Sequence, residues 1–372
     1  MKRTSAQLSE LRGMTLPELM VGLAVGLFVV TIAISTFVST RTLNVVNSSS
    51  TRMTENARLA TETLHTDLRS AGFAGCRTLK QRLELAPSVA LNGGIDSGFM
   101  TLGNSGVRGF TGTGAAHDPA LPDAVEVASA AFPPLTNSDV ISLRVPADNV
   151  AMGVIKRMAA PTASPELAAS APGNTIRQGD VVALADCISV ALFQVTAADP
   201  YGTGILDHAT GVLTPGNSVA QLYDDKKRPA FGKDATVYRM QTRHYYVAAS
   251  QRRPGTNSLW RLSVPAPDGG ALVPEEVAGG IDQLRVSFGI DTNVAEPEMN
   301  VGRYVKASDL GDLVAEWDKV LSARVQFVAA TAEDRMAHSA QTYQFAGSAV
   351  TAGDRRLRTV FTEVVALRNG AP

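Results

Sequence analysis

The sequence predicts an α+β protein in which one long N-terminal helix packs on an antiparallel, β-rich globular head. An apolar stretch long enough to cross a membrane lies near the N-terminus, and a one-sided apolar stripe at helical spacing follows it. After residue 140, β-branched or aromatic segments alternate with Pro/Gly loops. The chain has 372 residues, of which 45% are hydrophobic and 19% charged, so it can bury a sizeable core. Its net charge of -1 and scattered basic residues give no indication of nucleic-acid binding.

The first element is a candidate membrane span. Residues Leu19 to Thr40 include no charged side chain, and about 20 apolar residues suffice for a helix to cross a bilayer. Lys2 and Arg3 lie on the N-terminal side, so the positive-inside rule places the N-terminus in the cytoplasm. No A-x-A-like site follows the apolar stretch, which argues against an ordinary cleavable signal peptide.

The second element continues the first as one helix from about Thr15 to Ser70. Pro17 fits the first turn, where its missing N–H has no helical partner to lose. The apolar positions of the second half step by three and four residues, as one face of a helix requires. They are Met53, Ala57, Ala60, Leu64, Leu68 and Ala71.

The segment RGMTLPELMVGL (residues 12–23) combines a basic leader, a Gly, and a Glu five residues after that Gly. It resembles the class III signal of type IV pilins and pseudopilins, although Phe is commoner than Met after the cut. The resemblance implies that a prepilin peptidase cleaves between Gly13 and Met14, that Met14 is then N-methylated, and that the apolar helix is retained. The leader carries three basic residues and one acidic residue, so its removal would change the net charge from -1 to -3.

Three residues of the span are candidate assembly residues. Glu18 either reaches the interface near the positive end of the helix dipole, or pairs with the free α-amino group of a neighbouring subunit and sets the register between helices. The second interpretation is favoured, because an unpaired carboxylate in an apolar bundle costs several kcal/mol. Gly22 and Gly26 either allow close helix packing or are a chance feature of a Gly-rich span.

The rest of the chain is predicted to form a head built mainly from strands. The region from Gly93 to Gly114 holds eight glycines without a phosphate-loop ending, so we expect a surface loop there. Residues 307–320 are expected to form a short helix or turn with Leu310, Leu313 and Trp317 on one side. The expected strands are 139–145, 180–186, 188–196, 236–248, 258–264, 282–291, 322–331 and 355–368.

Several segments in this part of the chain are similar to the PilW family of type IV pilus minor pilins. They occur in family order from about residue 67 to 369, while 92–116 and 146–178 have no counterpart and are expected to be variable loops. The segments are DLRSAGFAGC, NSDVISLRV, GDVVALADCISVALFQVT, SLWRLSV, VAGGIDQLRVSFGID and RTVFTEVVALRN.

The resemblance also suggests a role for the two cysteines. Cys76 and Cys187 are placed like the two cysteines of that family, so it implies a disulfide in the exported head; the alternative is two buried thiols. The implied domains are a leader (1–13), a membrane and assembly helix (14–40), an amphipathic periplasmic helix (41–75) and the head (76–372).

The sequence contains no convincing catalytic or metal-binding constellation. The five histidines do not form an HExxH-like pair, and no G-x-S-x-G motif occurs. The loop with Asp291, Glu296 and Glu298 could bind calcium, but it lacks regular ligand spacing, and a solvated loop is the favoured interpretation. We therefore expect no enzyme activity and no cofactor.

The resemblance implies a structural subunit of the pilus initiation complex at the tip, with motility and adhesion downstream. Its expected partners are other minor pilins and the major pilin through the N-terminal helix, a large tip adhesin, prepilin peptidase and the inner-membrane assembly platform. The chain would span the inner membrane once, with its head in the periplasm, before it reaches the pilus tip. The alternatives are a minor pseudopilin of a type II secretion system and a signal-anchored periplasmic protein that keeps residues 1–13.

Overall fold

The computed structural model divides the chain into two compact units, Met1–Arg52 and Met53–Pro372. The residues that the structure describes are 14–73, 75, 88–91, 106–214, 216–265, 270–292, 300–311, 314–317, 319–367 and 369.

Helix α1 (Leu16–Ser70) starts and ends where the apolar pattern predicts. Within the first unit, its apolar side chains are exposed on every side, and Leu16, Leu27 and Phe28 are 74%, 73% and 68% exposed. A helix that is apolar all round requires a surrounding of lipid or of other helices. The described residues contain one helix long and apolar enough to cross a membrane, and it is α1.

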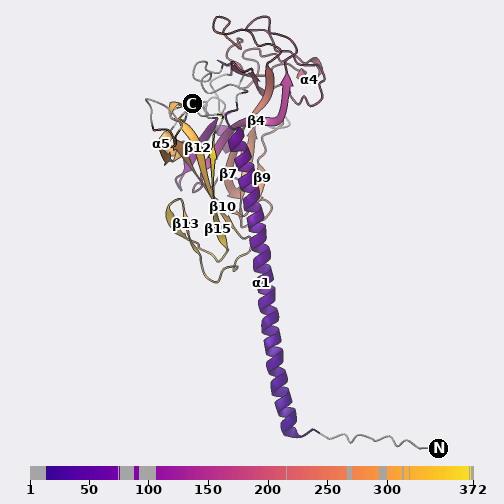
Figure 1. Cartoon of the computed structure of the whole chain (residues 1–372), viewed down its shortest axis with the longest axis vertical. Helices are drawn as coiled ribbons and strands as arrows, with labels where there is room; N and C mark the ends of the chain where they lie inside the picture. Colours follow the sequence, from indigo (N-terminus) through magenta and orange to yellow (C-terminus); the bar gives the residue numbers. More distant parts are fainter. Residues whose placement is uncertain are drawn as a thin grey trace, which may run out of the picture. The chain divides into compact units, whose positions relative to one another are not determined.

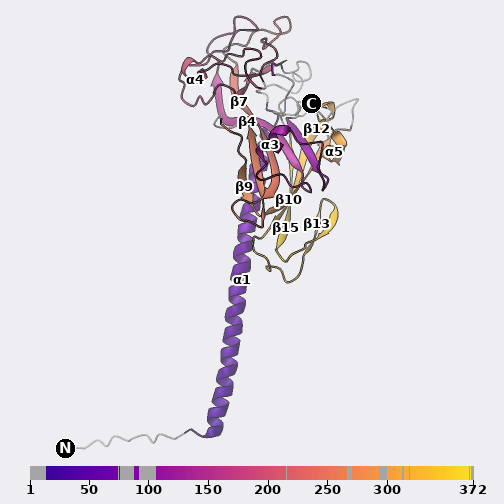
Figure 2. The same ribbon diagram turned by 180° about the vertical axis from the view of Figure 1, so that it is seen from behind.

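The second unit begins with the last five turns of α1, where the predicted stripe is the buried face. Met53, Ala57, Ala60, Leu64, Leu68 and Ala71 are each at most 7% exposed. They share one apolar core with residues from two β-sheets, including Leu143, Val247, Val286 and Phe327. The helix therefore completes the core of the head, as the amphipathic pattern predicts. Figures 1 and 2 show the strands of both sheets beside this end of α1.

The larger sheet has nine strands, in the order β1-β6-β5-β7-β4-β2-β3, with β8 and β9 attached beside β7. All of its pairs are antiparallel except the two-residue pair of β1 with β6. The strands are β1 (Ser88–Val89), β2 (Val107–Gly112), β3 (His117–Asp118), β4 (Val140–Gly153), β5 (Val181–Ala185), β6 (Val190–Gln194), β7 (Thr236–Ala249), β8 (Asn257–Val264) and β9 (Glu275–Gly279).

Strand β7 is the centre of this sheet. One of its edges pairs with β4 from Thr236 to Tyr245, and the other pairs first with β5 and then with β8. Because successive side chains of a strand face opposite ways, Tyr245 and Val247 enter the core under α1, while Tyr246 and Ala248 enter a core on the opposite face.

The smaller sheet has four antiparallel strands in the order β11-β10-β12-β15 (orange to yellow in Figure 1). Its inner face joins the core under α1, and its outer face carries polar side chains on β10 and β12. A two-stranded hairpin and four short helices complete the described elements. The bounds are β10 (Ile281–Ile290), β11 (Arg303–Val305), β12 (Val320–Ala330), β13 (Thr342–Phe345), β14 (Ser348–Thr351), β15 (Arg358–Ala366), α3 (Asp123–Ala128), α4 (Pro200–Thr203), α5 (Ala307–Leu310) and α6 (Val314–Trp317).

The predicted surface loop is wrong where β2 forms. Five of its six residues are buried, and its glycines allow close packing. A Cβ at Gly109 would lie 2.5 Å from the ring of Phe288, and one at Gly112 would lie 2.5 Å from the backbone of Ser138. Glycine therefore marks tight contacts in this strand, and the composition alone looked like a loop.

One further expectation is corrected. The segment expected to be variable loop from residue 146 includes the second half of β4, which pairs with β7 after a bulge. The short helix or turn expected at 307–320 is confirmed in the described residues, which form the single turns α5 and α6 and the start of β12, with Leu310 and Trp317 buried. Leu313 lies outside the described residues.

Candidate functional site

The start of α1 holds Glu18 in a capping arrangement. Thr15 precedes the first helical residue, and its backbone N–H and Oγ1 hydroxyl both donate to Oε2 of Glu18, at 3.0 and 2.8 Å. This is one half of a Ser/Thr-x-x-Glu capping box: the Glu18 carboxylate accepts the Thr15 N–H, a backbone donor that the helix leaves unpaired, and the Thr15 hydroxyl donates to the same carboxylate. A Glu at the third helical position thus has a local structural role as well as the candidate assembly role.

The other candidate residues of the span are exposed. Met14 directly precedes Thr15 and is 69% exposed, while Gly13 lies outside the described residues. A Cβ at Gly22 or Gly26 would meet no atom within 4 Å. The two glycines, four residues apart, therefore leave a shallow and accessible face on the helix.

Cys187 lies in the turn between β5 and β6, and Asp186 shapes that turn. Oδ1 of Asp186 accepts the backbone N–H of Ile188 at 2.8 Å and of Ser189 at 2.7 Å. Its Oδ2 accepts a hydrogen bond from Arg228, at 2.8 Å, in a pair in which both side chains are at most 5% exposed. Cys76 lies outside the described residues, and no described cysteine is free.

The described residues shortly before Cys76 lie against strands β5 and β7. Gly72 and Gly75 adopt the left-handed φ values of 70° and 74°, which favour glycine. Phe73 packs edge-to-face on Tyr238 of β7, with ring centroids 4.8 Å apart. A Cβ at Gly75 would lie 2.7 Å from that of Ala185, two residues before Cys187.

Asp67 is the polar anchor of α1 within the head, and sequence reasoning missed it. It is 4% exposed, and its two oxygens accept hydrogen bonds from Arg243 at 2.7 Å and from the Tyr245 hydroxyl at 2.5 Å. Burial raises the pKa of Tyr245, and the Asp67 charge adds to that effect, so the hydroxyl stays protonated and donates. The available signal was an acidic residue next to Leu68 of the apolar stripe.

A second polar contact joins α1 to the smaller sheet. Nδ1 of His65 lies 2.8 Å from Oε1 of Glu363 in β15. Four residues further along α1, the backbone oxygen of Arg69 accepts a hydrogen bond at 3.0 Å from the side-chain amide of Asn369, which follows Glu363 by six residues and lies just after β15. The end of α1 and β15 therefore run side by side in the same direction.

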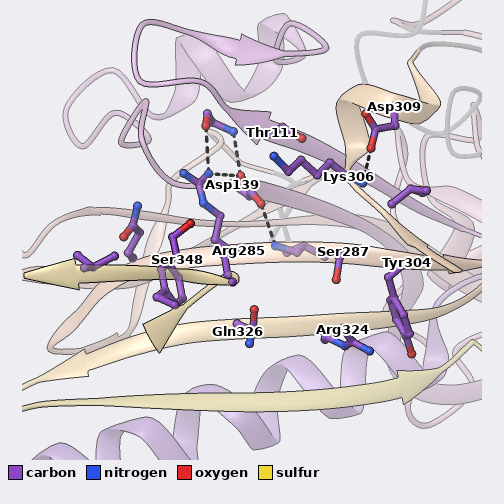
Figure 3. A pocket seen from close by; sticks show the side chains of 18 residues that line it. Thr111, Asp139, Arg285, Ser287, Tyr304, Lys306, Asp309, Arg324, Gln326 and Ser348 are labelled. Carbon is purple, nitrogen blue, oxygen red and sulfur yellow. Dashed lines mark hydrogen bonds and ion pairs between the residues drawn. The ribbon is translucent and has the colours of Figure 1, made fainter. Parts of the chain in front are cut away.

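The head also carries a polar groove of about 700 Å³ on the outer face of the smaller sheet, lined in part by the β13–β14 hairpin. At one end, Arg285 donates to Asp139 at 2.6 Å, and at the other the Arg324 guanidinium lies 3.7 Å from the centre of the Tyr304 ring. Figure 3 shows both pairs. The described lining contains neither His nor Cys, and its charged and amide groups suit the binding of a polar group.

The candidate calcium loop and the histidines do not converge. Asp291 is 8% exposed, whereas Glu296 and Glu298 lie outside the described residues. Within the part of the chain that the structure describes, no three His, Cys, Asp or Glu residues are placed to hold a metal ion. His244 is fully buried, and its Nδ1 lies 2.6 Å from the hydroxyl of Ser142 on the neighbouring strand.

One family model matches the C-terminal part of the head. Residues 244–369 match the model of the family described as type IV pilus-assembly protein W, PilW. The match supports assignment to the PilW family. No curated protein and no solved structure gives a match.

The PilW match covers the second half of β7 and every later strand. It therefore includes the smaller sheet and three of the residues that hold α1, namely Tyr245, Glu363 and Asn369. Arg243, which pairs with Asp67, lies one residue before the match. The chain is thus related to type IV pilus assembly, and its N-terminal apolar helix fits a single-pass membrane anchor. PilW is a family of pilus-assembly proteins and is not known as an enzyme family.

Proposed function

We propose that this protein is a type IV pilus minor pilin, a non-catalytic subunit that helps to initiate pilus assembly in the complex at the tip. The observation that carries the proposal is a helix whose first part is apolar and uncovered and has Glu18 at its capped start. The last turns of the same helix belong to the core of a head that matches PilW in its C-terminal part. Such a helix needs a lipid bilayer first and a bundle of similar helices later.

In this proposal, prepilin peptidase cleaves between Gly13 and Met14, and Met14 is methylated. The cut falls two residues before α1 begins, which leaves the folded helix intact. The new α-amino group then lies one residue before the Thr15 cap. Residues 14–40 act as the membrane and assembly helix, and 41–75 as its amphipathic continuation.

Glu18 then pairs with the α-amino group of a neighbouring subunit. Both local hydrogen bonds end on Oε2, and Oε1 accepts none from the residues that the structure describes. Capping therefore lowers the cost of placing the carboxylate in an apolar bundle and still leaves one oxygen for an amine. The open face at Gly22 and Gly26 lets a neighbouring helix approach closely.

The proposed partners are the other minor pilins and the major pilin through α1, a large tip adhesin, and the inner-membrane assembly platform. The N-terminus would begin in the cytoplasm and the head would fold in the periplasm. From there the subunit would pass into the pilus tip.

We also propose a disulfide between Cys76 and Cys187. Two observations support it: Gly75 approaches Ala185 at the end of β5, and Asp186 fixes the turn that carries Cys187. The bond would tie the segment after α1 to a central hairpin of the larger sheet.

The test is Glu18→Ala in the full chain, with Glu55→Ala as control because Glu55 is an exposed acid of the same helix. We expect N-terminal sequencing to find Met14 first in both variants. Recovery in sheared pili should fall at least tenfold for Glu18→Ala and stay unchanged for Glu55→Ala. Normal incorporation of Glu18→Ala would remove the assembly role of this residue.

A gene deletion tests the assignment to the pilus. We expect the deletion strain to lose surface pili and to keep type II secretion. Loss of secretion with normal piliation would instead place the protein in the secretion apparatus.

A further inference from the structure

Strand β15 forms one edge of the smaller sheet and pairs with a single described strand. Its nine residues, Arg358–Ala366, all lie opposite β12 in a register without a shift. The other described strands that end a sheet are shorter, with five residues in β9, four each in β13 and β14, three in β11 and two each in β1 and β3.

The register decides which backbone groups of β15 face outward. Two bonds frame the ladder: Thr331 N–H donates to Leu357 O, and Leu367 N–H donates to Leu321 O. In an antiparallel pair, residues alternate between bonding to the partner strand and pointing both groups away from it. The odd-numbered residues of β15 therefore bond to β12, and the even-numbered residues point to the free edge.

One contact supports this assignment. The N–H of Arg358, the first even-numbered residue, donates to the side chain of Gln341 at 2.6 Å, away from β12. The next four even-numbered residues have no backbone partner among the described residues, so water must satisfy them. They are Val360, Thr362, Val364 and Ala366.

This edge has little of the protection that isolated edge strands usually carry. It contains no Pro and no Lys, and its one acid, Glu363, turns inward to His65. Val364 is 50% exposed and its neighbours Thr362 and Ala366 are exposed. From Val360 to Ala366 the residues that point to this edge are uncharged and lack a backbone partner among the described residues, and such an edge is a template for another strand.

We propose that β15 accepts an antiparallel strand from the head of a different membrane-anchored subunit. The inference rests on the proposed function, which brings several such subunits together in one membrane. Backbone hydrogen bonds to Val360, Thr362, Val364 and Ala366 would then continue the smaller sheet across the subunit boundary.

The direction of α1 favours a different subunit over a second copy. The end of α1 runs parallel to β15, as the contacts of His65 and Arg69 establish. If two copies paired symmetrically through antiparallel β15 strands, the parts of α1 in their two heads would run in opposite directions. Their Met53 ends would then point in opposite directions, although in each copy this end leads to a membrane span. In a second copy, β11 runs opposite to α1 but offers only three residues to an edge of nine.

The experiment places the photocrosslinker p-benzoylphenylalanine at position 364 of the full chain, in cells that assemble pili. Val127, which is 78% exposed on α3, provides the control position. We expect position 364 to give a crosslinked peptide from the head of another membrane-anchored protein, and position 127 not to give it. Absence of an adduct at 364, or an adduct with a second copy of this chain, overturns the proposal.

A backbone variant separates strand pairing from contact through side chains. Thr362→Pro removes an outward N–H and leaves the bonds to β12 in place, whereas Thr362→Val keeps that N–H. We expect the adduct at 364 to fall at least tenfold with Thr362→Pro and to change less than twofold with Thr362→Val. An equal yield from both variants overturns the proposal.

Two further measurements make the outcome decisive. If Thr362→Pro unfolds the purified chain in detergent, amide hydrogen exchange of the unaltered chain replaces this variant. Exchange at residues 360, 362 and 364 should be at least tenfold slower in native membranes than in the purified chain, and equal exchange overturns the proposal. If the deletion strain lacks pili but cells that carry only the Thr362→Pro chain still make them, the strand-pairing proposal is refuted and the proposed function stands. If the deletion strain still makes pili, the proposed function itself is refuted.

Discussion

At the scale of single residues, Asp67 decides whether α1 stays fixed in the head. Replacing it with Ala leaves the Arg243 guanidinium, 16% exposed, without its ion-pair partner. Breaking a buried pair by removing one member is costly, so we expect a loss of about 3 kcal/mol in unfolding free energy. Urea unfolding of the full chain in detergent measures it, with exposed Glu62→Ala as control. A loss below about 1 kcal/mol for Asp67→Ala would contradict the anchoring role.

His244 gives the head a dependence on pH. Complete burial lowers the pKa of its imidazole from 6.5 to about 3, so the folded state keeps it neutral. The unfolded chain binds a proton below pH 6.5, and stability therefore falls as pH drops from 6.5 towards 3. By pH 5 the loss amounts to about 2 kcal/mol.

His244→Gln tests this prediction, since the amide can still bond to Ser142 without titrating. The variant should lose less stability than the unaltered chain between pH 6.5 and 5. His117, whose pKa is lowered by burial, remains in both proteins and contributes equally. Parallel stability curves for the two proteins would show that His244 does not cause the slope.

At the scale of elements, the stripe on α1 is what attaches the helix to two sheets. Leu64 is 2% exposed and Leu59, on the same helix, is 48% exposed. We expect Leu64→Ala to cost about 2–5 kcal/mol, because it removes buried methyl groups and leaves a cavity, and Leu59→Ala to cost below about 1 kcal/mol. Chemical unfolding of both variants in detergent makes the comparison, and similar losses would contradict the packing described for α1.

At the scale of the whole molecule, the proposed disulfide links the end of α1 to the larger sheet. Cys76 and Cys187 enclose 110 residues, and a closed loop of that length stabilises a fold by up to about 4–5 kcal/mol. We expect non-reducing peptide mapping of periplasm-derived protein to find the bridge, and reduction to lower the unfolding midpoint. Two free thiols in that protein would rule the bridge out.

Some expectations failed because composition does not report contacts between distant segments. The Gly-rich region looked like a loop, yet Gly109 is needed where β2 crosses Phe288, a residue 179 positions later in the chain. No pattern in the sequence singles out Asp67, and only the fold brings Arg243 and Tyr245 to it. In both cases the reason for the residue lies in a partner that the sequence cannot place.

The amino-acid sequence was sufficient to predict the features that depend on neighbours along the chain: the apolar span, the helix from about 15 to 70 with its buried stripe, and most of the long strands. These follow from local periodicity and from hydrophobic burial. The sheet order, the polar anchors of α1 and the free edge of β15 emerged from the fold alone, because they depend on contacts between residues far apart in the chain.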